Sequence, residues 1–199
     1  MYRWRAAPGR HPRGTWHVLA LHQKESNNNM SDGLGWVNVP AHWWDLMAPP
    51  PAFNVIVVAA ELASEGNSDM AASIVVDARQ DPRWLGIAGV RTLAGLLAGH
   101  GAHERFNQLR ADLIDRAAHQ HGDDIDDRVT ASLEAVSMAE CYERQQMGRL
   151  AELTSGSPFG PRETATVAAQ LVGGIVAIAA GDDTRPIFSA LRDRFGITR

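Results

Sequence analysis

The feature that most constrains this fold is the recurrence of apolar side chains at intervals of three and four residues along most of the chain. The segment 102–119 shows the pattern most clearly, because Phe106, Leu109 and Leu113 share one helical face while charged residues occupy the others. Each apolar stripe of this kind must be covered by another element. The sequence therefore predicts an all-α fold, a compact single-domain bundle in which the stripes pack against each other.

Proline, glycine and aspartate mark the ends of these helices. Asp81 followed by Pro82 is a typical N-cap with proline in the first turn, and Gly160 with Pro161 indicates another helix start. Gly196 is typical of a helix end. Together these signals predict about seven helices, at about 51–65, 68–80, 82–98, 102–119, 123–153, 161–180 and 184–196.

One short segment also fits a strand. Val-Ile-Val-Val at 55–58 is a run of β-branched residues, which strands favour. Pro51 suits the first turn of a helix, however, and the alanines after the run continue the helical pattern, so we expect a helix here.

Glycine and proline interrupt the segment 31–51, which ends in three consecutive prolines. They predict an irregular Trp/Pro-rich N-terminal segment with one short helical turn at about 41–47. Three tryptophans of this segment are expected to lie over the core as a lid: Trp36, Trp43 and Trp44.

Residues 1–29 differ in composition from the rest of the chain. They contain four arginines, three histidines and the only lysine, Lys24, and they end in a polar run before Met30. Back-translation of Gln-Lys-Glu at 23–25 allows a purine-rich ribosome-binding sequence just upstream of Met30. We therefore expect a disordered leader or a mis-assigned start at 1–29, followed by a single helical domain at 30–199.

The alternative is that residues 1–29 form a basic arm that binds nucleic acid. The chain has a formal net charge of -4, and this arm carries four Arg, one Lys and one Glu, which leaves -8 for residues 30–199. An acidic body disfavours contact with phosphate backbones, and the segment 82–98 is too apolar for a recognition helix, with only Arg83 and Arg91. Nucleic acid is therefore expected as a partner only if the arm is real.

Lysine and cysteine usage bears on origin and compartment. Apart from Lys24, the chain uses arginine in place of lysine, which indicates a high-GC bacterial or phage genome more than a chemical role. Cys141 is the only cysteine, so it has no partner for an intrachain disulfide and indicates no oxidising compartment. The N-terminal residues also lack the pattern of a secretory signal. We therefore expect a cytoplasmic protein.

His119, His121 and Asp123 form the best candidate metal site in the sequence. Imidazole and carboxylate groups are good ligands for divalent ions. The two histidines are two residues apart, however, and would point to different sides of a helix, while the acidic residues at 123–127 also suit a first helical turn. A solvated helix junction is the interpretation that we favour.

The remaining sequence carries no catalytic motif. His100 and His103 lack the HExxH order of a zinc protease, and Cys141 follows Glu140, whose charge raises the pKa of a thiol. The phosphate loop GxxxxGK[ST], the dinucleotide motif GxGxxG after a strand and the nucleophile elbow GxSxG do not occur in the sequence. The sequence therefore predicts no catalytic residue and no cofactor.

Residues 165–180 form the most apolar segment, in which Gln170 is the one strongly polar side chain. A membrane span needs about 20 apolar residues, and a Gly-Asp-Asp sequence ends this run at the short limit, so a core helix or a subunit interface is favoured. Ala169, Gly173 and Ala177 recur at four-residue spacing, which lets another helix approach closely. That helix is expected either in the same chain or in a second copy of it.

These observations favour a non-enzymatic helical protein that acts through protein–protein contacts. Its partner would be an unidentified protein or a second copy of the chain in a homodimer. The first alternative is a metal-binding protein or a metal-dependent helical enzyme that uses His119, His121 and Asp123. The second alternative is a nucleic-acid-associated regulator that uses the basic N-terminal arm.

Overall fold

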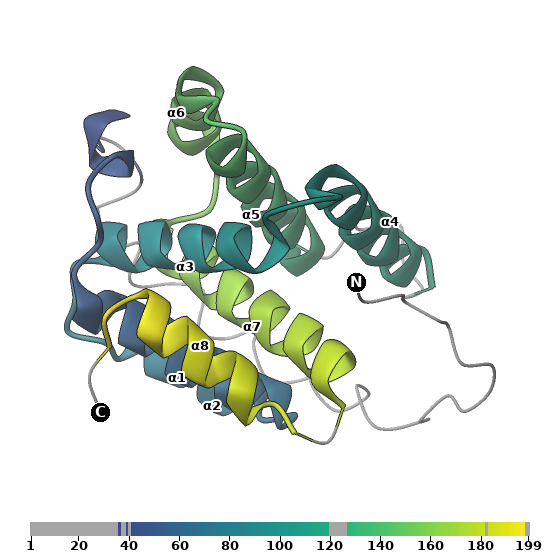
Figure 1. The fold of residues 1–199 in the computed structure, drawn as a ribbon. Coiled ribbons are helices and arrows are strands. Elements are labelled where there is room, and N and C mark those ends of the chain that lie inside the picture. The colour runs from purple at the N-terminus through teal and green to yellow at the C-terminus, as the bar shows by residue number, and fades with distance from the viewer. Residues whose placement is uncertain (1–35, 37–38, 40, 120–126, 182, 198–199) are drawn as a thin grey trace, which may run out of the picture. The chain divides into compact units, whose positions relative to one another are not determined.

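The apolar periodicity of the sequence corresponds to helices throughout the described part of the chain. A computed structural model describes residues 36, 39, 41–119, 127–181 and 183–197. These residues form eight α-helices, one 3-10 helix and no strand (Figure 1). The helices are η1 (Ala41–Trp44), α1 (Pro50–Ser64), α2 (Ser68–Val76), α3 (Pro82–Leu97), α4 (Ala102–His119), α5 (Asp127–Glu143), α6 (Met147–Gly156), α7 (Pro161–Ala180) and α8 (Arg185–Arg194). The predicted all-α class is confirmed, and the run at 55–58 is helical.

The sequence signals for helix ends act as expected. Asp81 caps α3 by accepting a hydrogen bond from the backbone N–H of Arg83 at 2.9 Å, and Pro82 begins the helix. Proline also lies in the first turn of α1, α7 and α8. After α8, Gly196 has a φ of 64°, a left-handed conformation that glycine adopts without strain. These ends follow from local sequence.

The prediction of one continuous helix at 123–153 is wrong. The described part of this segment contains two helices, α5 and α6, with a break between Glu143 and Met147. Gln145 has a φ of 56°, and the next backbone N–H donates to the carbonyl oxygen of Cys141 at 2.8 Å, which closes the end of α5. Neither glycine nor proline marks this break in the sequence. The turn lets Leu150 of α6 reach the core, where it is fully buried.

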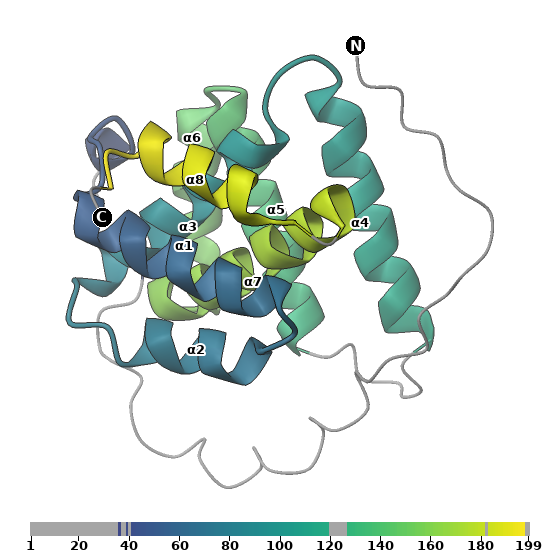
Figure 2. The same cartoon turned by 60° about the horizontal axis from the view of Figure 1, so that its bottom comes forward.

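Helix α7 lies among the other helices and packs against α1, α2, α3 and α5 (Figure 2). Small residues allow two of these neighbours to approach closely. A Cβ added at Gly173 would lie 2.4 Å from the carbonyl oxygen of Ala60 in α1, and one added at Gly89 in α3 would lie 3.1 Å from the Cα of Ala165. A methyl group at either position would crowd a neighbouring backbone. The small residues of α7 therefore serve helix packing within the chain.

In the described part of the chain, α7 is also the one helix that is long and apolar enough to cross a membrane by length and composition alone. The core helix of a soluble protein has the same properties. The alanines and valines on one side of α7 are buried by the neighbouring helices, and Ala165, Ala168 and Val172 are fully inaccessible. Burial within the fold therefore accounts for the apolar residues on that side of α7, and 44% of its most apolar stretch is buried.

The tryptophans of the segment 31–51 complete the core. Trp36 and Trp44 are buried members of it, with their ring centroids 5.6 Å apart. Trp36 lies against Gly86 of α3, where an added Cβ would lie 2.5 Å from its ring. Trp43 is partly buried against the same core. The predicted lid is therefore accurate only for Trp43, because the other two side chains are inside.

Arginine side chains close two helix C-termini. Arg105 of α4 donates hydrogen bonds to the carbonyl oxygens of Leu97 and Ala98 at 2.7 to 2.9 Å, where α3 ends. A further bond from the same guanidinium reaches the carbonyl oxygen of His100. Arg162 of α7 satisfies three carbonyls at the end of α2 in the same way. Because the last carbonyls of a helix have no partner within it, a planar group with five N–H donors is well suited to this position.

Candidate functional site

The structure describes only one residue of the predicted metal site. His119 is the last residue of α4, and its Nδ1 lies 2.6 Å from the carbonyl oxygen of Asp115. His121 and Asp123 lie outside the described residues, so the metal site stays a prediction. Within the ranges that the structure describes, His, Cys, Asp and Glu side chains form no group of three or more that could hold a metal ion.

The predicted interface residues lie on a helix that the chain itself covers. Ala169 is fully buried, Gly173 is buried against α1, and Ala177 is partly buried. We call the contact of Ala169 and Gly173 with the rest of the fold the α7 seam. These two residues are used for packing within one chain, and association of two copies through them stays an untested prediction.

Cys141 lies on the buried side of α5. Burial raises the pKa of its thiol, and the adjacent Glu140 carboxylate acts in the same direction, although three nearby arginines oppose them. A buried thiol with a raised pKa is a poor nucleophile at neutral pH. Cys141 therefore fits a packing role.

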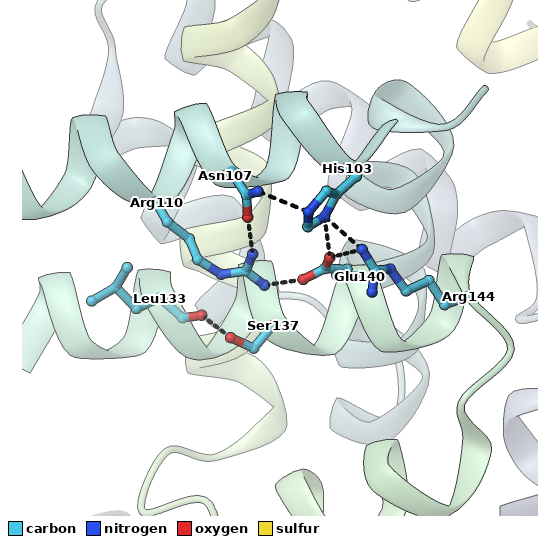
Figure 3. A network of polar contacts seen from close by, with 7 residues as sticks. All are labelled: His103, Asn107, Arg110, Leu133, Ser137, Glu140 and Arg144. Atoms are coloured by element: carbon cyan, nitrogen blue, oxygen red, sulfur yellow. Dashed lines mark hydrogen bonds and ion pairs between the residues drawn. The ribbon is translucent and has the colours of Figure 1, made fainter. Parts of the chain in front are cut away.

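A network of charged and polar side chains joins α4 to α5 (Figure 3). Its centre is the carboxylate of Glu140, which is 14% exposed and forms ion pairs with Arg110 of α4 and with Arg144, the residue after the end of α5. The Arg144 pair has an N···O distance of 2.8 Å, and His103 of α4 approaches the same carboxylate with Nδ1 at 3.4 Å. Asn107 lies between His103 and Arg110 on the α4 side.

The electrostatics of this network favour an ionised Glu140. Burial alone would raise the pKa of its carboxyl group, but the hydrogen bond and charge of Arg110, assisted by Arg144 and His103, hold this pKa below its ordinary value. A carboxylate whose pKa is lowered by two guanidinium groups binds a proton weakly and makes a poor general base. The network is therefore suited to tying α4 to α5.

A second cluster lies where η1 meets α3. Trp43 of η1 stacks on Trp84 of α3 with ring centroids 4.5 Å apart and an interplanar angle of 6°. Arg83 belongs to the same cluster, because its guanidinium carbon lies over the Trp43 ring, 4.8 Å from the ring centre. Stacked aromatic rings with a cation above them hold each other in place. This stack fixes η1 on the N-terminal half of α3.

Arg91 holds the chain that follows η1. Its Nη1 donates a hydrogen bond to the carbonyl oxygen of Leu46 at 2.6 Å, and its guanidinium carbon lies 5.0 Å from the centre of the Tyr142 ring. The side chains of Leu46 and of the following residue, Met47, are exposed to solvent, at 48% and 62%. We define the η1 surface as six residues: Trp43, Asp45, Leu46, Met47, Trp84 and Arg91.

The charges near the η1 surface differ in how they are paired. Arg83 forms an ion pair with Asp81 at 2.6 Å, and its hydrogen bond holds the pKa of Asp81 below the usual value. Arg91 and the exposed Asp45 form no ion pair with each other or with any other residue that the structure describes. The η1 surface therefore presents one cation and one anion beside two exposed apolar side chains.

Comparison with protein-family models, with curated proteins and with solved structures finds no match for this chain. Its function must therefore be inferred from the side chains themselves.

Most of the η1 surface could not be recognised in the sequence. Trp43 is one of the predicted lid residues, but the sequence does not distinguish Leu46, Met47 and Trp84 from other apolar residues. The only available signal was the Leu-Met pair inside a segment rich in proline and tryptophan. The backbone of Leu46 is held by a hydrogen bond from Arg91, which lies 45 residues further along the chain.

Proposed function

We propose that this protein is a non-enzymatic helical protein that acts through protein–protein contacts made by the η1 surface. The observation that carries the proposal is the exposure of Leu46 and Met47, two adjacent residues that closely follow Trp43, which stacks on Trp84. Soluble domains commonly expose single apolar residues, whereas adjacent exposed ones near an aromatic pair make a candidate interaction patch.

The residue types of this patch support the proposal. Trp, Met and Arg are enriched in protein interfaces, and Trp and Arg are the most frequent residues at positions that dominate binding energy. Both types are present in the η1 surface, as Trp43, Trp84 and Arg91.

The rigidity of the patch supports it as well. Binding is weakened when side chains and loops must become ordered in the complex. Here the Trp43 stack and the bond from Arg91 to the Leu46 carbonyl already fix the backbone in the free chain. The backbone that carries these side chains therefore needs little further ordering on binding.

Affinity purification of the tagged full chain from its native host tests this function. We expect at least one protein, or an untagged copy of the chain, to be recovered with the wild type and lost with Met47→Asp. Ile178→Asp is the matched control, since Ile178 of α7 is 71% exposed and lies outside the η1 surface. Identical recovery with wild type and Met47→Asp would refute the proposal.

A further inference from the structure

We infer that the η1 surface binds a second copy of this chain, so that two η1 surfaces meet across a two-fold axis. This inference rests on the proposed function and names its partner. Two-fold dimers are the commonest symmetric assemblies, and their interface uses the same patch on both subunits. Such a patch must be complementary to itself in both shape and charge.

The apolar part of the patch meets this requirement directly. Leu46 and Met47 are adjacent and exposed, and apolar side chains pair as well with their own kind as with any other. Placing the two-fold axis beside them would cover these residues in both copies at once. The Trp43 and Trp84 rings, which are partly buried already, would lie around this centre.

The charges of this surface are also complementary to those of a second copy. Asp45 immediately precedes Leu46, the residue whose carbonyl oxygen binds Arg91, so the anion and the cation belong to one small area. Neither has an ion-pair partner among the described residues of its own chain. An acidic partner would repel Asp45 and a basic partner would repel Arg91, whereas a second copy offers each charge its opposite.

Among the exposed large apolar residues of the described chain, only Leu46 and Met47 are adjacent in sequence. Ile178 of α7 is 71% exposed, more than Met47 at 62%, but it has no exposed large apolar residue next to it in sequence. It therefore serves as the control for apolar exposure alone.

Sedimentation velocity of the purified full chain over a range of concentrations tests the inference. We expect a reversible monomer–dimer equilibrium for the wild type and for Ile178→Asp. Met47→Asp and Asp45→Arg should each raise the dimer dissociation constant by at least about tenfold. A wild type that stays monomeric at every concentration, or a dimer that neither substitution weakens, would overturn the inference.

A charge exchange sharpens the test. Arg91→Asp alone should weaken the dimer, and the double variant Asp45→Arg with Arg91→Asp should recover at least about tenfold of the lost affinity, because opposite charges again face each other. Because Arg91 also holds Leu46, circular dichroism and a thermal melt must show that each variant is folded. If Arg91→Asp does not fold, Asp45→Arg decides alone, since the exposed Asp45 side chain makes no ion pair with a described residue.

The two proposals fail in different ways. If the wild type is monomeric but still recovers another protein from the native host, and Met47→Asp abolishes that recovery, then the partner is not a second copy. The η1 surface would still be a binding site. If the wild type is monomeric and Met47→Asp recovers the same proteins as the wild type, the proposed function itself is refuted.

Discussion

The α7 seam and the η1 surface are both apolar, but the chain covers only one of them. At the seam, Gly173 and Ala169 are buried against neighbouring helices, with the Gly173 backbone close to that of Ala60. At the η1 surface, which includes the stacked Trp43 and Trp84, the side chains of Leu46 and Met47 remain 48% and 62% exposed. The comparison shows that apolar composition alone does not identify a candidate binding surface. What matters is whether other residues of the chain cover the apolar side chains.

Charged groups show the same contrast. Glu140 is held by two arginines between α4 and α5, so its charge is satisfied inside the chain. Asp45 and Arg91 have no such partners among the described residues. Substitution of Glu140 should therefore affect folding, whereas substitution of Asp45 should affect association; Arg91 also holds the Leu46 backbone, so its substitution can affect both.

The largest effect on stability is expected at the α7 seam. In Gly173→Ala, the new methyl group would meet the carbonyl oxygen of Ala60, and the free energy of unfolding should fall by about 2 to 3 kcal/mol. Gly174→Ala is the matched control, because an added Cβ there has no heavy atom within 4 Å. It should raise the free energy of unfolding by about 0.5 to 1 kcal/mol through helix propensity. Urea denaturation measures both, and a stabilised Gly173→Ala would show that the seam is open.

The next effect is expected at the charged network. Glu140→Gln leaves Arg110 and Arg144 without their carboxylate, and the free energy of unfolding at pH 7 should fall by about 1.5 kcal/mol. Glu143→Gln, on the same helix, removes a carboxylate that forms no ion pair with a described residue and should change little. Equal effects of the two variants in chemical denaturation would contradict a special role for Glu140.

The Glu140 effect should also depend on pH. The folded pKa of Glu140 lies below its ordinary value of 4.5, so its ion pairs stabilise the folded chain fully above about pH 5.5. This contribution is lost as the pH falls through 4.5 toward the lower folded pKa. The difference in unfolding free energy between wild type and Glu140→Gln should therefore shrink on acidification, and a difference that grows would show the opposite pKa shift.

A smaller effect is expected at the arginine that closes α3. Arg105→Lys keeps the positive charge but replaces a planar group that binds three carbonyls with a single ammonium. The free energy of unfolding should fall by about 1 kcal/mol, as measured by thermal or urea denaturation. Arg116→Lys, on the exposed side of the same helix, is the control and should leave stability unchanged. If Arg105→Lys leaves the free energy of unfolding unchanged, the guanidinium group has no special role in closing α3.

The smallest effect on stability is expected at the η1 surface. Met47→Asp changes a side chain that is 62% exposed, so the free energy of unfolding should shift by less than about 0.5 kcal/mol while binding is lost. A thermal melt of the variant, measured at a concentration where the wild type is monomeric, checks this. A large destabilisation would mean that Met47 is covered within the chain and would remove the contrast with the α7 seam.

Much of the fold could be predicted because its signals are local. Asp81 and Pro82 begin α3 as expected, and the apolar spacing of α4 matched its limits, Ala102–His119. The break after α5 was missed because Gln145 adopts a left-handed conformation that is usual for glycine or asparagine. The small residues of α7 were recognised as suited to close packing, but nothing in their spacing says which helix approaches them.

By itself, then, the sequence determined that this chain is helical, where most helices begin and end, and which faces must be covered, because capping and periodicity depend on neighbours within a few positions. Only the tertiary structure decided that α1 covers Gly173 and that Met47 is left mostly exposed. The reason is that coverage of a side chain depends on residues far away in the sequence, such as Arg91 beside Leu46, whose approach follows from the packing of whole helices.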